Sequence, residues 1–225
     1  MKILMSGYNG KMGKTIREIY ENVENINDFV ENSNEISTEY VIIDFSNPST
    51  LEKLLTFSIE NNLSLVLCTT GYTEEQIEMI ENAAKKVPIL ASYNTSIGIN
   101  LIADILQKTP ALKEFDCEII DIHHKEKKDA PSGTGILLRN SIGIVNSKGI
   151  DIPIHSLRIG NVVGEHKVIF SKDDETIEII HKAGSRKIFA NGAIAAAKFL
   201  IGKKPRLYGM EALLKEKNKW LYLIY

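Results

Sequence analysis

Short apolar runs alternate with segments of helical periodicity between Met1 and Thr95, and this alternation limits the folds open to the chain. Four runs have the length and composition of strands: Lys2–Ser6, Tyr40–Phe45, Leu63–Cys68 and Val87–Tyr93. Strands that alternate with helices of about 10–15 residues form parallel sheets with helices on both faces. The sequence therefore predicts a parallel α/β domain in this part of the chain.

Three helices are expected between these strands. The first takes its apolar face from side chains at helical spacing: Met12, Ile16, Ile19 and Val23. Asn47-Pro48 predicts an N-cap and a first-turn proline for the second helix. Thr73 and Gln76 have the spacing of a capping box, which predicts the start of the third helix.

The pattern changes after Asn94, where longer strands replace the earlier alternation. Two helices and three strands are expected, over Leu101–Lys108, Gly133–Val145, Phe115–His124, Arg158–Phe170 and Glu175–His181. A short turn joins the last two strands, which is typical of an antiparallel sheet. We therefore expect a second, α+β domain with a mainly antiparallel sheet over residues 96–192. Residues 1–95 with 193–225 would form the first domain, with helices at Ala193–Leu200 and Met210–Leu214.

Composition narrows the class of protein. The 225 residues carry 27 basic and 29 acidic side chains, a formal net charge of −2, and 44% of them are hydrophobic. This ordinary globular balance argues against disorder and against a strongly basic nucleic-acid-binding protein.

The apolar runs fall far short of the ~20 residues of a membrane span, and no apolar signal region follows Met1. Cys68 and Cys117 lie in apolar runs and are expected to be reduced thiols. We expect a soluble, cytoplasmic protein without nucleic-acid or membrane partners.

The turn after the first strand has a glycine at every third position, in the segment Gly7-Tyr8-Asn9-Gly10-Lys11-Met12-Gly13. Gly7 permits a tight turn, Gly10 lets the backbone approach a pyrophosphate, and Gly13 lets helix and strand pack closely. N–H groups at the helix start add donors and partial positive charge. Dinucleotide binding is the favoured interpretation. The spacing G-x-x-G-x-x-G differs from G-x-G-x-x-G, however, so a turn that binds nothing stays open.

Two further turns are candidates for the same nucleotide site, Thr69-Thr70-Gly71 and Tyr93-Asn94-Thr95. Both follow predicted strands, and ligands of open parallel sheets lie at the carboxyl ends of strands. Ordinary loop chemistry is the alternative. In NAD-binding folds an acid about 20 residues after the glycine loop holds the adenosine ribose. Asp28 and Glu31 flank Phe29-Val30, which is expected to be a short strand, and Glu31 is the better placed at its end.

Histidines and lysines gather between Asp121 and Thr134, after the expected strand Phe115–His124. Strand alternation places Asp121 and His123 on one face and His124 on the other, so the two histidines point apart. No cysteine or carboxylate stands at the usual ligand spacing, so no metal site is expected. The cations could instead hold a dicarboxylate, with donors from Gly133 and Thr134, and transfer a proton. A solvated charged loop is the alternative.

This segment, written in full His123-His124-Lys125-Glu126-Lys127-Lys128-Asp129-Ala130-Pro131-Ser132-Gly133-Thr134, resembles the signature of the dihydrodipicolinate reductase family. These are the 4-hydroxy-tetrahydrodipicolinate reductases of lysine and diaminopimelate biosynthesis. The glycine loop is similar to the family's nucleotide loop. Further segments resemble its other motifs in order: Asp44-Phe45-Ser46, Thr69-Thr70-Gly71, Asn94–Asn100, Gly164-Glu165-His166, His181-Lys182-Ala183 and Phe189–Ala193. The resemblance covers almost the whole chain.

The resemblance implies the reduction of a cyclic imino dicarboxylate to tetrahydrodipicolinate by NADH or NADPH. It implies that His123 is the proton donor or acceptor and Lys127 the proton donor, and that His124, Gly133 and Thr134 bind substrate. It also implies a set of cofactor-binding residues: Gly7, Tyr8, Asn9, Gly10, Lys11, Met12, Cys68, Thr69, Thr70, Ser92, Tyr93, Asn94 and Thr95. The first domain would be Rossmann-like and bind the dinucleotide. The second would bind substrate and form a homotetramer through its sheet.

Two residues depart from the family's pattern. Cys68 stands where the family often has glycine, and Glu126, where a basic or aromatic residue is common, is expected to lower the local positive potential. Two other functions stay open. One is another nicotinamide-dependent dehydrogenase, such as a relative of aspartate or homoserine dehydrogenase, and the histidine–lysine signature argues against it. The other is a non-catalytic nucleotide sensor on the same scaffold, and the retention of His123 and Lys127 argues against that.

Overall fold

The computed structural model of the chain describes residues 1–30, 39–143 and 152–221. The chain divides into two compact units, one formed by Met1–Ser96 and Lys187–Tyr225 and the other by Ile97–Arg186. The chain re-enters the first unit at Lys187, where the helix α7 (Lys187–Leu200) begins. No helix among the described residues is long and apolar enough to cross a bilayer.

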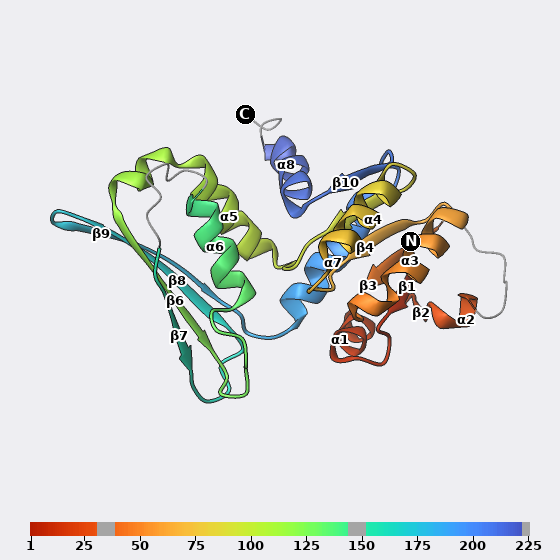
Figure 1. Ribbon diagram of the computed structural model, residues 1–225, viewed down its shortest axis with the longest axis horizontal. Coiled ribbons are helices and arrows are strands. Elements are labelled where there is room, and N and C mark those ends of the chain that lie inside the picture. The colour runs from red at the N-terminus through yellow and green to blue at the C-terminus, as the bar shows by residue number, and fades with distance from the viewer. Residues whose placement is uncertain (31–38, 144–151, 222–225) are drawn as a thin grey trace. The chain divides into compact units, whose positions relative to one another are not determined.

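The first unit is built on a sheet of six strands (Figure 1). They are β1 (Lys2–Ser6), β2 (Val23–Asn25), β3 (Tyr40–Asp44), β4 (Ser64–Leu67), β5 (Pro88–Ala91) and β10 (Arg206–Tyr208). They lie in the order β10-β5-β4-β3-β1-β2, and every described pairing is parallel. The structure confirms the parallel α/β sheet that the alternation of strands and helices predicts, and with it the Rossmann-like domain that the family resemblance implies.

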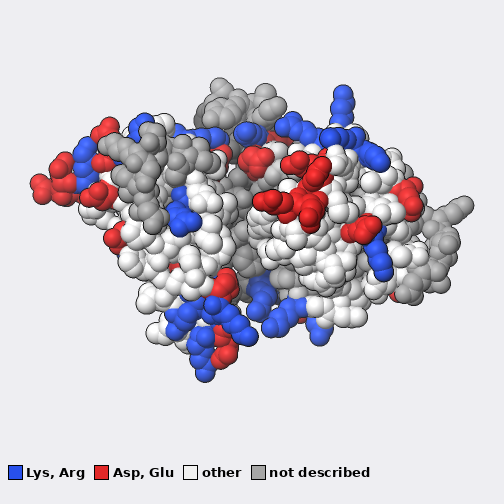
Figure 2. Space-filling view, in the orientation of Figure 1, with Lys and Arg blue, Asp and Glu red and all other residues white. Residues whose placement is uncertain are grey.

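Helices bury this sheet. Leu4, Ile42 and Leu65 share one core cluster with apolar side chains of α3 (Leu51–Glu60) and α4 (Glu74–Ala84). α7 contacts β3, β4 and β5, and it also contacts α1 (Lys11–Ile19). Four buried alanines on α7 let its backbone come close to the strands: Ala190, Ala193, Ala196 and Ala197. Strands buried in this way are apolar almost throughout, as β3 is. Charged side chains are common on the surface instead, where Figure 2 shows both basic and acidic residues on the face in view.

Two helix starts are confirmed. The Asn47 side chain accepts a hydrogen bond from the Ser49 N–H at 3.0 Å, at the 3₁₀ turn η1 (Pro48–Thr50) that leads into α3. Thr73 and Gln76 form the capping box of α4, with hydrogen bonds of 3.3 and 3.1 Å. Each cap satisfies backbone N–H groups that have no partner within the helix.

Two predictions for the first unit fail, and one strand is missed. Val23 begins β2 and does not extend the first helix, which ends at Ile19. Phe29 and Val30 lie in the short helix α2 (Asn27–Val30), because the strand that pairs with β1 comes earlier, at Val23–Asn25. β10 precedes the last helix, α8 (Met210–Leu221), and was not predicted. Strands of three residues are too short to show a period of their own.

The second unit has a four-stranded sheet with the order β7-β6-β8-β9. Its elements are α5 (Ile97–Lys108), η2 (Pro110–Glu114), β6 (Asp116–His123), α6 (Gly133–Gly143), β7 (Ile154–Arg158), β8 (Glu165–Lys172) and β9 (Glu175–Lys182). β6 pairs in parallel with β7, and the other pairings are antiparallel, which confirms a mainly antiparallel sheet. The predicted strand Arg158–Phe170 is wrong as a single element. A turn that contains Gly160, with a φ of +51°, separates β7 from β8.

Helices cover one face of this second sheet. Leu106 of α5 and Leu138 of α6 share a core cluster with Ile119, Val168 and Phe170 of the strands, and Figure 1 shows both helices on the same side of β6 and β8. The opposite face, called the outer face below, carries five apolar side chains that are half-buried or exposed: Ile120, Ile122, Leu157, Ile169 and Ile180.

Candidate active site

The strands of the second sheet place polar residues in one row on the helix-covered face. Asp121 on β6 lies opposite Ser156 on β7 and His166 on β8, and His166 lies opposite His181 on β9. The predicted alternation along β6 is confirmed, because Asp121 and His123 are both buried while the residues beside them are not. Buried polar groups are costly unless they have partners, so the contacts within this row need a full account.

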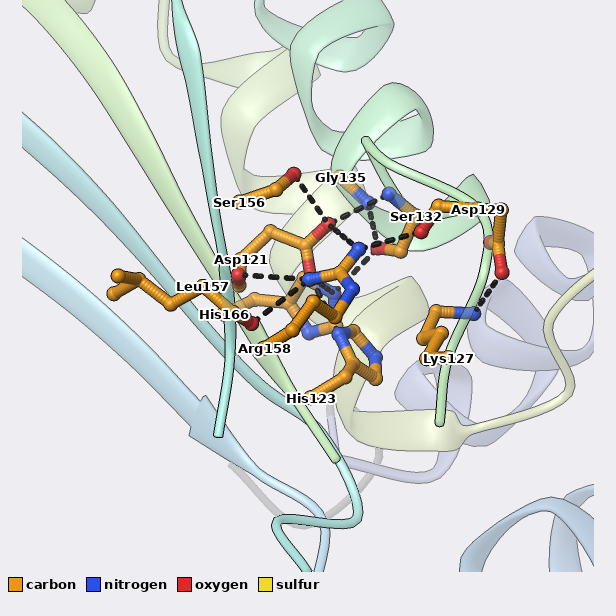
Figure 3. Close-up of polar contacts among 10 residues, drawn as sticks. All are labelled: Asp121, His123, Lys127, Asp129, Ser132, Gly135, Ser156, Leu157, Arg158 and His166. Atoms are coloured by element: carbon orange, nitrogen blue, oxygen red, sulfur yellow. Dashed lines mark hydrogen bonds and ion pairs between the residues drawn. The ribbon is translucent and has the colours of Figure 1, made fainter. Parts of the chain in front are cut away.

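Asp121 lies at the centre of this cluster, and its carboxylate is fully buried (Figure 3). Its Oδ1 lies 2.5 Å from His123 Nδ1, but the two atoms do not have the alignment of a hydrogen bond. Its Oδ2 accepts a hydrogen bond from the Ser132 N–H at 2.6 Å, and Arg158 Nη2 lies 3.5 Å away. Ser156 Oγ donates to the same oxygen at 3.4 Å. One carboxylate therefore joins β6, β7 and the loop before α6.

Asp121 and His166 differ in charge at neutral pH. Burial alone would raise the pKa of Asp121, but the His123 ring and the Ser132 N–H stabilise the carboxylate and lower the pKa below its ordinary value. Burial lowers the pKa of His166 to about 4, against the opposing effect of Asp121. His166 is therefore a neutral imidazole at pH 7, and its Nε2 lies 3.0 Å from Ser132 Oγ.

The start of α6 is held by Ser132. Its hydroxyl accepts a hydrogen bond from the Gly135 N–H at 3.1 Å, in the manner of a helix N-cap. Gly133 is exposed, and a Cβ built on it would meet no atom within 4 Å. Thr134 follows and is half-buried. The predicted carboxylate-binding pair therefore opens a helix, where N–H groups and the helix dipole favour an anion.

Lys127 lies in the loop after β6, with its Nζ 2.8 Å from Asp129 Oδ1. Burial would raise the pKa of Asp129, but Lys127 lowers it. Arg158 Nη2 donates to the Asp129 carbonyl at 2.5 Å and so ties this loop to β7. Glu126 lies 4.0 Å from Lys125, and both side chains are largely exposed. The acid in contact with Lys127 is therefore Asp129, and not Glu126, the residue that differs from the family's pattern.

Asp121, His123 and His166 each offer one possible metal-ligand atom, and these atoms lie within 4.8 Å of one another. The adjacent pair His123-His124 does not form this set, because its second histidine comes from β8. Contacts within the protein already use these side chains, since Asp121 meets His123 and Ser132 meets His166. Asp121 Oδ1, His123 Nδ1 and His166 Nδ1 are nevertheless buried without a hydrogen-bond partner among the described residues, so these contacts leave part of the cluster unsatisfied.

In the first unit, the glycine loop connects β1 to α1. Gly7 has a φ of +80°, and a Cβ there would lie 2.5 Å from the Phe45 carbonyl oxygen. A Cβ on Gly13 would collide with the carbonyl oxygens of Tyr8 and Gly7. Gly10 supplies no side-chain cap, and the first turn of α1 contains no acidic residue. The loop thus combines close backbone packing with uncapped N–H groups, and it fits a pyrophosphate.

The carboxyl ends of β3 and β4 meet at Asp44, which is buried. Its oxygens accept hydrogen bonds from the Ser46 N–H at 3.1 Å, Thr69 Oγ1 at 2.6 Å and Tyr72 OH at 3.3 Å. The Thr69 hydroxyl therefore faces the protein, whereas Thr70 is exposed at the same turn. Of the predicted cofactor residues here, Thr70 has the accessible side chain.

Cys68, just before this turn, is a buried free thiol. Burial, followed by the charge of Asp44, raises its pKa well above the ordinary value. Cys117 is also free, and burial raises its pKa to about 12. Both cysteines are free, as the sequence predicts, and their raised pKa values keep them protonated at neutral pH.

The turn after β5 contains the remaining predicted cofactor residues. Tyr93 is exposed, while Asn94 and Thr95 are buried. Ser92 Oγ donates to the Asn94 carbonyl at 2.8 Å, and Thr95 Oγ1 donates to the Phe189 carbonyl of α7 at 2.7 Å. These hydroxyl groups fix the turn, so Tyr93 and the turn's backbone are what it presents to a ligand.

The predicted ribose acid is not placed at a strand end. β2 ends at Asn25, and Asp28 lies beyond it as an exposed residue of α2. Glu31 lies outside the described residues. At the position where NAD-binding folds carry an acid after the second strand, this chain has the neutral amide of Asn25.

Within the second unit, the structure brings His123, Lys127 and the start of α6 to one end of β6 (Figure 3). His124 follows the last residue of β6, and its carbonyl accepts the Lys127 N–H at 3.1 Å. Sequence reasoning missed the partners Ser132, Arg158 and His166. His166 lies in the quoted motif Gly164-Glu165-His166, but its place beside Asp121 depends on strand register, which one sequence does not fix.

Comparisons with known proteins find matches to one protein family. Two family models match, "Dihydrodipicolinate reductase, N-terminus" over residues 19–95 and "Dihydrodipicolinate reductase, C-terminus" over residues 98–214. The first of these matches begins after the glycine loop. The chain is 44% identical to a 4-hydroxy-tetrahydrodipicolinate reductase of Thermosipho africanus, over 96% of this chain and 99% of that protein. It is 41% identical to one of Clostridium novyi, over 96% and 99%.

Solved structures support the fold. A dipicolinate-bound dihydrodipicolinate reductase from Paenisporosarcina sp. TG-14 matches with a TM-score of 0.75 and 24% identity, over 94% of this chain and 98% of that one. A probable dehydrogenase from Thermotoga maritima matches with a TM-score of 0.59 and 9% identity, over 95% and 92%. The residues that the two family models match include the histidine–lysine segment and every described strand except β1, and the chain belongs to the dihydrodipicolinate reductase family.

Proposed function

We propose that this chain reduces 4-hydroxy-tetrahydrodipicolinate to tetrahydrodipicolinate with NADH or NADPH, a step of lysine and diaminopimelate biosynthesis. One observation carries the proposal. The buried pair Asp121–His123 lies with Lys127 and the start of α6 in a chain that matches reductases of this name over nearly their full length. The reaction consumes one reduced cofactor and one proton, and it releases water and the oxidised cofactor.

His123 and Lys127 supply the proton in this proposal. A nicotinamide, when bound, would supply hydride, and the substrate ring that accepts it would need a proton from the protein. A positioned histidine or lysine carries out this kind of transfer. His123 is 8% exposed, so it is shielded from bulk water, and Lys127 keeps its side chain 22% exposed beside Asp129. We assign His123 as proton donor or acceptor and Lys127 as proton donor.

The substrate's carboxylates are bound by the same segment. A dicarboxylate carries two negative charges, which cations and helix N–H groups stabilise. Gly133 and Thr134 stand at the start of α6 with open space at the glycine, and His124 lies at the end of β6. We assign these three residues to substrate binding.

The cofactor binds the first unit. We assign it to the glycine loop and to the turns after β4 and β5, through Gly7, Tyr8, Asn9, Gly10, Lys11, Met12, Cys68, Thr69, Thr70, Ser92, Tyr93, Asn94 and Thr95. Asn25 at the end of β2 has no charge to repel a 2′-phosphate, and Lys11 lies at the start of α1. These two residues support the use of either NADH or NADPH.

An assay of cofactor oxidation tests the function. Substrate is formed in situ by condensing pyruvate with aspartate semialdehyde. Oxidation of NADH or NADPH is followed by the loss of absorbance of the reduced nicotinamide. Oxidation that requires both precursors supports the reductase, and the ratio of rates gives the cofactor preference. Cofactor binding without oxidation, together with failure to bind pyridine-2,6-dicarboxylate, would favour the nucleotide sensor.

We also infer that four copies associate through the outer face of the second sheet. Leu157 is 50% exposed and Ile180 46% exposed on this face, and they share it with three further isoleucines. Apolar side chains gathered on one surface mark an interface between proteins. The free thiols of Cys68 and Cys117 suit the reducing cytoplasm, where we place the enzyme.

A further inference from the structure

Asp121 has no role in the chemistry proposed above, yet it touches both parts of the substrate site. Oδ1 lies 2.5 Å from His123 Nδ1, and Oδ2 accepts the Ser132 N–H at 2.6 Å. Ser132 directly precedes Gly133 and Thr134, so the second contact fixes the start of α6. The Asp121 carboxylate is fully buried.

The His123 ring is confined on its other side by Gly164. A Cβ built on Gly164 would lie 3.1 Å from His123 Nε2, closer than side chains normally approach. Nδ1 lies 2.5 Å from Asp121 Oδ1, out of alignment for a hydrogen bond, and has no other hydrogen-bond partner among the described residues. Nδ1 is turned to the carboxylate, so Nε2 is the nitrogen left for proton transfer.

We propose that Asp121 is the positioning residue of this site, holding His123 in the tautomer protonated on Nδ1 while it anchors the start of α6 through Ser132. The catalytic consequence rests on the proposed reductase function, whereas the tautomer does not. An ionised carboxylate can accept hydrogen bonds but cannot donate them, so the neutral ring that faces it carries hydrogen on Nδ1 and a lone pair on Nε2.

The substitution Asp121→Asn separates the two contacts. The asparagine oxygen can still accept the Ser132 N–H, but the amide NH₂ then faces Nδ1 and selects the tautomer protonated on Nε2. In the Ser-His-Asp triad the same change leaves the geometry intact and lowers kcat by about 10⁴-fold. We expect Asp121→Asn to lower kcat at least about 100-fold, while the affinity for pyridine-2,6-dicarboxylate changes less than about threefold, because the start of α6 keeps its anchor.

A double-mutant cycle shows whether Asp121 acts through His123. If it does, Asp121→Asn costs no further activity when His123 is already alanine. Losses that multiply in the double variant, or a single variant that keeps half of its kcat, would overturn the proposal. Glu118→Gln is the matched control, since it breaks the exposed pair of Glu118 with His155, 3.0 Å apart, on the other face of β6. It should leave kcat unchanged.

Histidine ¹⁵N spectra give a readout independent of turnover. In wild-type protein at alkaline pH, where a histidine is neutral, the His123 signals (assigned by their loss in His123→Ala) should show Nδ1 protonated. An Nε2-protonated ring would overturn the proposal, even if Asp121→Asn does not fold. If wild-type protein fails to oxidise either cofactor but shows the Nδ1 tautomer, the reductase function fails and the positioning of His123 stands.

Discussion

His123 and Lys127 are held by different kinds of partner. A buried carboxylate fixes His123, while Lys127 pairs with Asp129, whose side chain is 58% exposed. Removing a proton-transfer group costs about 10²–10⁴-fold in rate. We expect His123→Ala and Lys127→Ala each to lower kcat by that order. NADH affinity should persist, because both residues lie in the second unit and the cofactor residues in the first.

Steady-state kinetics and NADH fluorescence titration check these two variants. Lys128→Ala is the control, since it removes a neighbouring exposed cation from the same loop and should keep turnover near wild type. Wild-type turnover in both His123→Ala and Lys127→Ala would contradict the assigned roles.

Gly13 is the residue of the nucleotide loop with the least room for a side chain. A Cβ there would collide with two backbone carbonyl oxygens, of Tyr8 and Gly7, and neither belongs to a flexible side chain. We expect Gly13→Ala to destabilise the protein by about 1–3 kcal/mol, the usual cost of overpacking, and to weaken NADH binding. Urea unfolding and NADH titration measure both effects.

Gly184→Ala provides the comparison for Gly13→Ala. A Cβ at Gly184 meets no atom within 4 Å, and its φ is not positive. Gly184→Ala should change neither the free energy of unfolding nor the affinity for NADH. Equal behaviour of the two alanine variants would show that the glycine loop does not need its close packing.

At the scale of elements, the polar row across the second sheet makes stability depend on pH. The folded pKa of His166 is about 4, below its ordinary value of 6.5, so only the unfolded chain binds a proton between these pH values. Stability from this group is therefore present above pH 6.5 and falls as the pH falls towards 4, by about 3 kcal/mol in all. The lowered pKa of Asp121 adds a loss at still lower pH.

Urea unfolding at pH 7 and pH 4.5 tests the His166 contribution. His166→Gln keeps an amide that can meet Ser132 but cannot titrate. The variant should lose less stability than wild type between the two pH values, by about 2–3 kcal/mol. Identical pH dependence in the two proteins would mean that His166 is not buried in its neutral form.

Elements with a clear period or a cap could be predicted from the sequence. β1, β3 and α4 are predicted by apolar runs or by the capping box of Thr73 and Gln76. The break between β7 and β8 could not be predicted, because the apolar residues near Gly160 continue the pattern of a strand. Likewise, the histidine–lysine segment predicts the location of the site, but the contact of Asp121 with Ser132 depends on tertiary folding.

At the scale of the whole molecule, the outer face of the second sheet leaves apolar side chains exposed on a single chain. Leu157 and Ile180 lie on strands at opposite edges of the sheet, with Glu165 and Lys167 of β8 on the same face between them, so the outer face combines apolar and charged side chains across its width. Leu157→Lys and Ile180→Lys each place a charge on it, and burying an unpaired charge opposes association. Light scattering should show wild-type protein at four times the chain mass of 25.2 kDa and both variants at a lower mass. Ile77→Lys, an exposed isoleucine of α4 in the first unit, should stay tetrameric. A monomeric wild-type protein would contradict the tetramer. Variants that all remain tetrameric would place the interface elsewhere, because burying an unpaired lysine charge in an apolar contact costs free energy.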